Sequence, residues 1–238
     1  DIVVAGYQRT DLATGGGSIY GGGKGGFGIA FTYAQIKDPT DGAATSALLS
    51  DSDISDVRGI AVTAANSGHI ASGAATLGVL NQNGIGLSIV MAEVSPTIAA
   101  ALTGALASPA QVAASGDVTV ASSSARNSAF DARIAGAFAA VLPGTTPPAA
   151  DSGFDMAGAA LGLGDTSQSA MIVAVAGLVQ QGKNNLGFSM VDNTIAQTHR
   201  SVMSGIVLTA VGDVTVGAQN SSVIAGIAAG GVFSPTEL

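Results

Sequence analysis

A short segment recurs three times along the chain, and this recurrence constrains the fold more than any other feature. The copies are Gly26–Ile36 (GFGIAFTYAQI), Gly84–Val94 (GIGLSIVMAEV) and Asn185–Ile195 (NLGFSMVDNTI). Each has a glycine at its third position, followed by residues that alternate between two sides, which is typical of a β-strand. A second motif follows each copy, at Gly59–Ala64 (GIAVTA), Asp117–Ser122 (DVTVAS) and Asp213–Ala218 (DVTVGA). The chain therefore repeats at least one pair of strands.

The spacing of the two motifs supports a true repeat. The interval from Gly28 to Ile60 equals the interval from Gly86 to Val118, so both motifs move along the chain by the same period. In the third copy the interval from Gly187 to Val214 is shorter, which indicates that five residues are lost where the second copy carries SPAQV. The third copy also starts later than this period allows, so some 40 additional residues lie between the second copy and the third. A fixed period of this kind is typical of solenoids and repeat arrays.

The composition favours a thin and regular core. Hydrophobic residues make up 47% of the chain, but charged residues only 10% and aromatic residues 4%, whereas globular domains carry about 25% charged residues. The apolar residues are mainly Ala, Val and Ile, which suit narrow β layers. We expect a stack of parallel coils of the order of twenty residues, with about three coils in each repeat, that forms a narrow rod.

We expect one β-solenoid domain over residues 1–238. The predicted repeats cover about 26–83, 84–141 and 184–238. Residues 142–169 have no counterpart elsewhere and hold three of the seven prolines. They are predicted to form an insertion, with a loop and a short helix over Met156–Leu163.

Several local patterns predict turns or strands. The glycine-rich segment Thr14–Gly26 and the segment Asn66–Gly68 are predicted to be turns. Thr97–Ala107 has the alanine content of a helix, but its counterparts in the other copies do not, so we expect a strand.

Charge and hydropathy restrict the partners. The net charge is −8 and the chain has no cluster of Lys or Arg, so we expect no nucleic-acid partner, because phosphate binding needs a basic patch. No apolar run is long enough for a spanning helix, and a membrane barrel would need aromatic girdles that this chain can hardly supply. We expect no membrane insertion. The absence of cysteine excludes disulfides and thiolate-bound metals and is compatible with export.

Two motifs could belong to a ligand site. Gly23–Gly28 satisfies GxGxxG, but a dinucleotide site needs this motif to open a helix, and here it opens a strand. Asp51, Asp53 and Asp56 supply carboxylates of the kind that calcium accepts. The spacing is not that of an EF-hand and the second copy lacks these residues, so a solvated turn is favoured. Calcium is the one cofactor left open.

No residue set predicts catalysis. His69 and His199 are the only histidines, and neither has the spaced partners of a zinc site. The chain has no GxSxG elbow, although a Ser-His-Asp triad built from scattered residues stays open. We therefore assign no catalytic, cofactor-binding or metal-binding residue, and we predict that the chain is not an enzyme.

The order of the motifs resembles a known class of repeats. The order begins with GKxGxG, which opens an alternating strand. The next motif is ALL, ALTG or VMSG, and it is followed by GDVTV and SSVIAGIAAGG. This is similar to filamentous-haemagglutinin-like and leukotoxin-like repeats of large exported bacterial adhesins, most clearly at Gly212–Gly231 and Gly116–Val120. The likeness is fainter in the first copy, where Gly59 replaces the aspartate, and it does not cover Leu142–Ser169. The resemblance implies a right-handed parallel β-helix, tolerant of calcium, that serves in adhesion or as a stalk.

The predicted function is that of an extracellular, cell-surface structural or adhesive β-solenoid. It would act as a repeat segment of a larger chain or as a self-associating fibre subunit. Because the ends of such a stack are open strand edges, we expect them to meet other copies or adjacent repeats end to end. A host or neighbouring cell surface is a further candidate partner.

Two other functions stay open at this point, and so does a different fold, a non-solenoid β-sandwich or a membrane barrel. A polysaccharide-active β-helix enzyme would need a groove with paired carboxylates. An ice- or mineral-binding solenoid would need a ladder of threonines, but Ala61 interrupts the ladder of Thr119 and Thr215.

Overall fold

The computed structural model describes residues 1–39, 42–80, 83–124 and 170–233, and all the regular structure in these ranges is β-strand. The first coil contains β1 (Ile2–Gly22), β2 (Gly25–Lys37), β3 (Thr45–Ser50) and β4 (Ile54–Val57). The second contains β5 (Ile60–Leu80), β6 (Asn83–Ser95), β7 (Thr97–Thr103) and β8 (Ala110–Ala114). The third contains β9 (Val118–Ser124), β10 (Ala170–Gln181), β11 (Asn184–Ile195), β12 (Thr198–Ser204) and β13 (Ile206–Ala210), and a fourth begins with β14 (Val214–Gln219) and β15 (Ser222–Phe233).

The coils stack through parallel sheets. Sheet A contains β1, β5, the pair β9 and β10, and the pair β14 and β15. Three further sheets have the orders β2-β6-β11 (sheet B), β3-β7-β12 (sheet C) and β4-β8-β13 (sheet D). The prediction of an all-β chain with parallel sheets is therefore confirmed for the described residues, as a solenoid-like stack, and β7 confirms the strand predicted at Thr97.

One coil, and not about three, makes up each repeat. Gly28 lies beside Gly86 and Ile60 beside Val118, so a strand pairs with its own equivalent in the next copy of the repeat. The predicted coil of about twenty residues is too short because β1 and β5 are each 21 residues long. At about 3.3 Å per residue such a strand spans roughly 70 Å, whereas each coil adds only about 4.8 Å to the stack. The described coils form a broad, thin slice and not a narrow rod.

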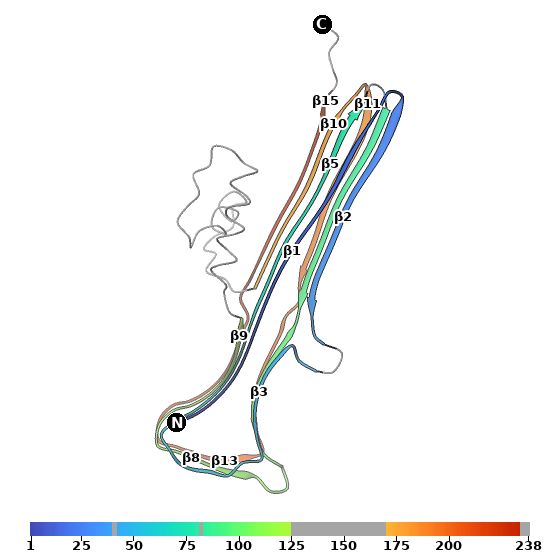
Figure 1. The fold of residues 1–238 in the computed structure, drawn as a ribbon. Helices are drawn as coiled ribbons and strands as arrows, with labels where there is room; N and C mark the ends of the chain where they lie inside the picture. Colours follow the sequence, from blue (N-terminus) through green and yellow to red (C-terminus); the bar gives the residue numbers. More distant parts are fainter. Residues whose placement is uncertain (40–41, 81–82, 125–169, 234–238) are drawn as a thin grey trace.

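The coil is flattened along most of its length and opens at one end (Figure 1). In the flattened part, β1, β5, β10 and β15 of sheet A lie opposite sheet B. At the other end, sheets C and D complete a wider loop. Each part has its own core. The wide end buries Ile60, Val62, Ile98 and Leu102, among others. The flattened part buries Ile70, Ala74, Val90, Val94 and Ile172, among others.

Of the two predicted turns, Asn66–Gly68 is wrong and Thr14–Gly26 is confirmed only near its end, because neighbouring strands keep the rest of these segments extended. Thr14–Gly22 continues β1, in register with β5, and the chain reverses only between Gly22 and Gly25. Asn66–Gly68 lies within β5. Asn66 is a buried interior residue whose Nδ2 donates hydrogen bonds to Thr45 Oγ1 at 3.0 Å and to Gln8 Oε1 at 3.3 Å. The amide that resembled a turn signal belongs to a polar contact between the two cores.

The recurring glycine of the first motif makes room for side chains of the opposite sheet. Gly28, Gly86 and Gly187 form one row across sheet B. A Cβ on Gly28 would lie 2.5 Å from Tyr20 Cε1, and one on Gly86 would lie 2.6 Å from Leu178 Cδ1. Contacts this short do not occur between real atoms, so only glycine allows the two sheets to approach this closely.

The insertion interrupts one side of the third coil. β9 and β10 together occupy the length of the single strand β5, with Ser124 opposite Asn66. The chain therefore leaves this side after Ser124 and returns at Ala170. The predicted insertion 142–169, its short helix and the end of the second predicted repeat lie outside the described residues.

The five residues missing from the third copy are not SPAQV. Gln111 and Val112 have partners in β13, at Val207 and Leu208. The extra residues of the second coil lie between β7 and β8, where a bridge joins Ala105 to Ser108. The third coil crosses the same corner with Gly205 alone, whose φ of 61° suits glycine.

We predict that Gly28→Ala lowers the free energy of unfolding by about 1–3 kcal/mol, because the new methyl group overpacks against the Tyr20 ring. Gly177→Ala is the matched control, since a Cβ there would meet no atom within 4 Å; it should be neutral or slightly stabilising. Urea denaturation of both variants checks this. Equal stability of the two variants would show that the glycine row does not serve close packing.

Candidate interaction surfaces

The open end of the stack exposes side chains that are core residues elsewhere. Val118 and Val120 of β9 are completely buried, with 0% exposure. Val214 and Val216 occupy the same positions one layer further on, in β14, and are 49% and 48% exposed. Residue type and register are identical in the two layers. The difference arises because no strand equivalent to β6, β7 or β8 is described in the layer of β14, so no opposite sheet covers these two valines and this end presents an unfinished core.

The two ends of the stack differ in shape. Sheet A has four layers, whereas sheets B, C and D each have three. β14 and β15 therefore stand one layer beyond β11, β12 and β13. At the opposite end, β1 to β4 form a complete outer coil, and Arg58 pairs there with Asp1 at 3.5 Å. This ion pair is exposed and adds little stability.

From the row of Phe27 to the row of Phe31, the outward side of sheet B is apolar across all three strands, and in the next row it is apolar on β2 and β6. We call it the apolar face; its residues are Phe27, Ile29, Phe31 and Tyr33 of β2, Ile85, Leu87, Ile89 and Met91 of β6, and Leu186, Phe188 and Met190 of β11. The β2 side chains are each about half exposed. None of the described strands covers this face (Figure 1). The alternation of the recurring segment was visible in the sequence, but which of its two sides faces solvent was not.

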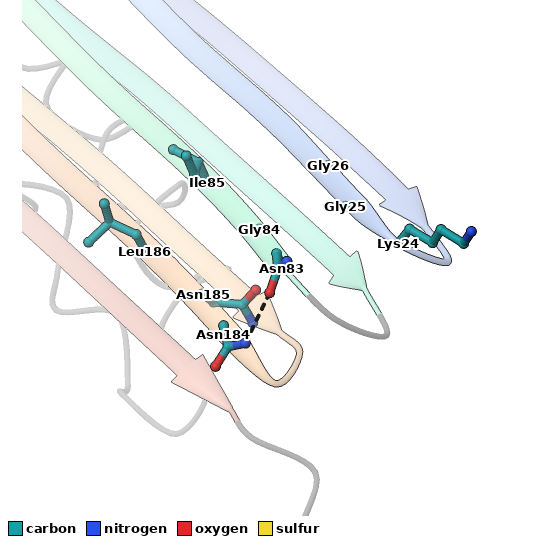
Figure 2. Close-up of a pocket in the computed structure, with 9 residues that line it drawn as sticks. All are labelled: Lys24, Gly25, Gly26, Asn83, Gly84, Ile85, Asn184, Asn185 and Leu186. Carbon is teal, nitrogen blue, oxygen red and sulfur yellow. Dashed lines mark hydrogen bonds between the residues drawn. The ribbon is translucent and has the colours of Figure 1, made fainter.

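A shallow hollow of about 600 Å³ lies at the flattened end of the coil, beside the apolar face (Figure 2). It is lined by Lys24, Gly25, Gly26, Asn83, Gly84, Ile85, Asn184, Asn185 and Leu186. Asn184 Nδ2 donates a hydrogen bond of 3.0 Å to Asn83 Oδ1 across neighbouring strands. The lining holds amides and a lysine but no carboxylate, so it offers hydrogen bonds and no acid–base pair. Sequence reasoning missed this hollow, although both asparagines directly precede copies of the first motif.

The predicted calcium candidates do not form a site. Asp51 and Asp56 have positive φ angles of 49° and 61°, which aspartate tolerates in turns. Asp53 Oδ1 accepts a hydrogen bond of 2.8 Å from the backbone N–H of Gln111 in the next coil. Across the described part of the chain, no group of three or more His, Asp or Glu side chains could hold a metal ion. Asp53 therefore joins two neighbouring coils through its carboxylate, whereas Asp51 and Asp56 shape the chain there through their backbone conformation.

Among the described residues, His199 does not complete a catalytic triad. His69 is fully buried in β5. His199 of β12 lies with its Nε2 3.2 Å from Ser124 Oγ, and Ser124 also donates to Gln197 Oε1 at 3.0 Å. His199 Nδ1 is buried and has no hydrogen-bond partner among the described residues. A triad needs a carboxylate at that nitrogen. Burial lowers the pKa of His199, which keeps the ring neutral near pH 7.

The GxGxxG match is not a nucleotide site. Its last four residues, Gly25–Gly28, form the start of β2, with no helix after them. The phosphate of a dinucleotide bound by this motif would need the N–H groups at the start of a helix.

No helix in the described ranges is long and apolar enough to cross a membrane.

Comparison of the chain with protein-family models, with curated proteins and with solved structures finds no match.

One carboxylate joins the first two coils. Asp38 follows β2 and accepts hydrogen bonds from Thr97 N at 2.5 Å, Thr97 Oγ1 at 2.6 Å and Ala44 N at 3.0 Å. Burial raises the pKa of Asp38, but these hydrogen bonds outweigh it, so the pKa lies below the ordinary value of 3.8.

We predict that Asp38 contributes stability at neutral pH that is lost on acidification. Because its pKa is depressed in the folded state, the contribution is complete above the unfolded value of 3.8 and disappears as the pH falls through the folded value. Asp38→Ala should therefore be less stable than the parent chain at pH 7, and the difference should shrink below pH 3.8. Denaturant titrations across this range measure it. A difference that stays constant with pH would contradict this assignment.

Proposed function

We propose that the chain is a structural or adhesive segment of an extracellular β-solenoid, a right-handed parallel β-helix of the exported adhesin type. Its role is to extend the stack: the open ends pair with further coils, from neighbouring repeats or from other copies. The observation that carries this proposal is the contrast between the buried valines of β9 and the half-exposed valines of β14. Burying such side chains is favourable, so an additional layer has a ready driving force.

The open edges support the same role. Each outer strand presents backbone N–H and C=O groups in the geometry that a parallel partner requires. At the wide end the inward positions of β14 repeat those of β9, so an added coil of similar sequence finds the environment that the second coil already has. The structural role therefore needs no dedicated site, because the backbone and the repeating core supply the affinity. A host or neighbouring cell surface is the corresponding partner of an adhesive segment.

The alternative is a polysaccharide-active enzyme of the β-helix type. It would need two carboxylates facing each other across a groove, and no observation among the described residues favours it over a structural segment.

We predict that supplying the rest of the fourth coil stabilises the protein. Phe233 lies beside Gln181, and Gln181 lies beside Val79, so Phe233 has the same position in the fourth coil as Val79 has in the second. A copy of residues 80–117 placed directly after Phe233 therefore carries strands equivalent to β6, β7 and β8. These strands can pair with β11, β12 and β13. Burial of Val214 and Val216 should add about 1 kcal/mol each, so the midpoint of urea denaturation should rise.

The matched control is the same extension with its copies of Ile98 and Val112 changed to lysine. Both residues are almost completely buried, in β7 and β8 of the wide-end core that also holds Val118 and Val120, so charged replacements cannot pack against Val214 and Val216 in a fourth coil. The control should leave the midpoint unchanged. If the unmodified extension raises the midpoint no more than the control, the open end does not accept a coil and the proposal fails.

A further inference from the structure

We infer that the apolar face of sheet B is a docking surface for a second copy of this chain, and that two copies pack sheet against sheet. This inference goes beyond the proposed function, because it concerns association from the side of the coil and not through the open strand edges.

The apolar face concentrates the exposed aromatic residues of an aromatic-poor chain. Aromatic residues make up 4% of the sequence. Phe27, Phe31, Tyr33 and Phe188 all lie on this face and are 51–61% exposed. Soluble proteins rarely leave a contiguous apolar area of this size in water unless it meets a partner.

The face is continuous because the three strands are in register. Phe27 pairs with Ile85, which pairs with Leu186, and the next outward positions repeat this row with other apolar residues. Over the rows from Phe27 to Phe31 every outward residue is apolar. The first charged residue appears at Asp192, in the row of Tyr33. Parallel in-register strands thus present a continuous apolar surface.

Polar residues border the face at both ends. At one end lies the hollow with Lys24 and the hydrogen-bonded pair Asn83 and Asn184 (Figure 2). At the other, Gln35 Nε2 donates a hydrogen bond of 2.8 Å to Glu93 Oε2 across β2 and β6. An apolar centre with a polar rim is the usual composition of a protein–protein interface.

The area suits a dimer. A large side chain that is half exposed offers roughly 100 Å², since Phe and Tyr bury about 150–250 Å² when fully enclosed. The seven most exposed residues of the face therefore offer on the order of 700 Å², and the less exposed ones add to this. A standard interface buries about 800 Å² on each partner. Two apolar sheet faces can pack about 10 Å apart, as in β-sandwiches.

A second copy fits this face better than a glycan or a membrane. The centre of the face has no side chain that could bind a sugar hydroxyl, because Ile29, Leu87, Phe188 and their neighbours are all apolar. The net charge of −8 disfavours an anionic membrane surface. A second copy presents the same uncharged surface, so no charge is left unpaired at the centre of the contact.

The test is the mass of the protein in solution as a function of concentration, measured by light scattering and sedimentation. We expect a dimer. Ile89→Lys places a charge at the centre of the face, on the middle strand β6, and should weaken dimerisation at least about 100-fold, because a lysine cannot be buried there without a partner. Phe31→Lys, on the edge strand β2, is a second variant with the same expected effect. Thermal denaturation verifies that both variants fold.

Two controls separate this dimer from pairing of the open ends. Ile19→Lys changes a residue of β1 that is 82% exposed on sheet A, and it should leave the dimer intact. Val216→Lys obstructs the unfinished core of β14 and should also leave it intact, whereas it would abolish association through the strand edges.

Three outcomes would overturn the inference. The parent chain could be a monomer at all concentrations, the folded Ile89→Lys and Phe31→Lys variants could remain dimers, or Val216→Lys could abolish association. The inference would also be overturned if the parent chain were a monomer that binds vesicles of neutral phosphatidylcholine and Ile89→Lys abolished this binding, because the face would then be assigned to lipid.

Discussion

In-register pairing of strands one coil apart is the interaction on which the structure depends. Each strand of the second coil has a parallel neighbour on both sides. On the side of the first coil, this neighbour is the equivalent strand one repeat earlier in the chain, as β1 is for β5 and β2 is for β6. The pairing satisfies the backbone groups of the second coil. It allows long glycine-rich segments such as Thr14–Gly22 to remain extended, although isolated glycine-rich segments favour turns. The same pairing sets equivalent positions of the repeats above one another, so that both cores run through the stacked coils.

The flattened shape of the coil follows from a second constraint, the close approach of two sheets. Tyr20 crosses the interior and its hydroxyl accepts a hydrogen bond from Gln180 Nε2, two strands away. Gly28 on the opposite sheet leaves the space that its ring fills, and Gly78 on the neighbouring strand β5 leaves room beside it. Small residues on one sheet therefore match large ones on the other, and the repeated glycine follows from this packing and not from a need for positive φ.

The two surfaces proposed for association have different physical origins. The open ends expose backbone groups and core valines because a stack of finite height must end somewhere. The apolar face exists at every layer, since it is the outward side of sheet B. A longer stack would bury the first kind of surface and enlarge the second. End-to-end pairing and side-to-side packing are therefore compatible, and together they would build a fibre that is thicker than one coil.

The sequence by itself determined the strand class, the period of the repeat and the alignment of the repeated motifs, because alternation and spacing are local properties. It could not determine that one coil makes one repeat, since that depends on whether Thr14–Gly26 and Asn66–Gly68 turn or stay extended. A neighbouring strand and the opposite sheet decide this, and both are far away in sequence. Likewise, the alternation of Phe27, Phe31 and Tyr33 predicted two faces of a strand. Only the tertiary structure decided which face is outward, because it alone places sheet A against the glycine side.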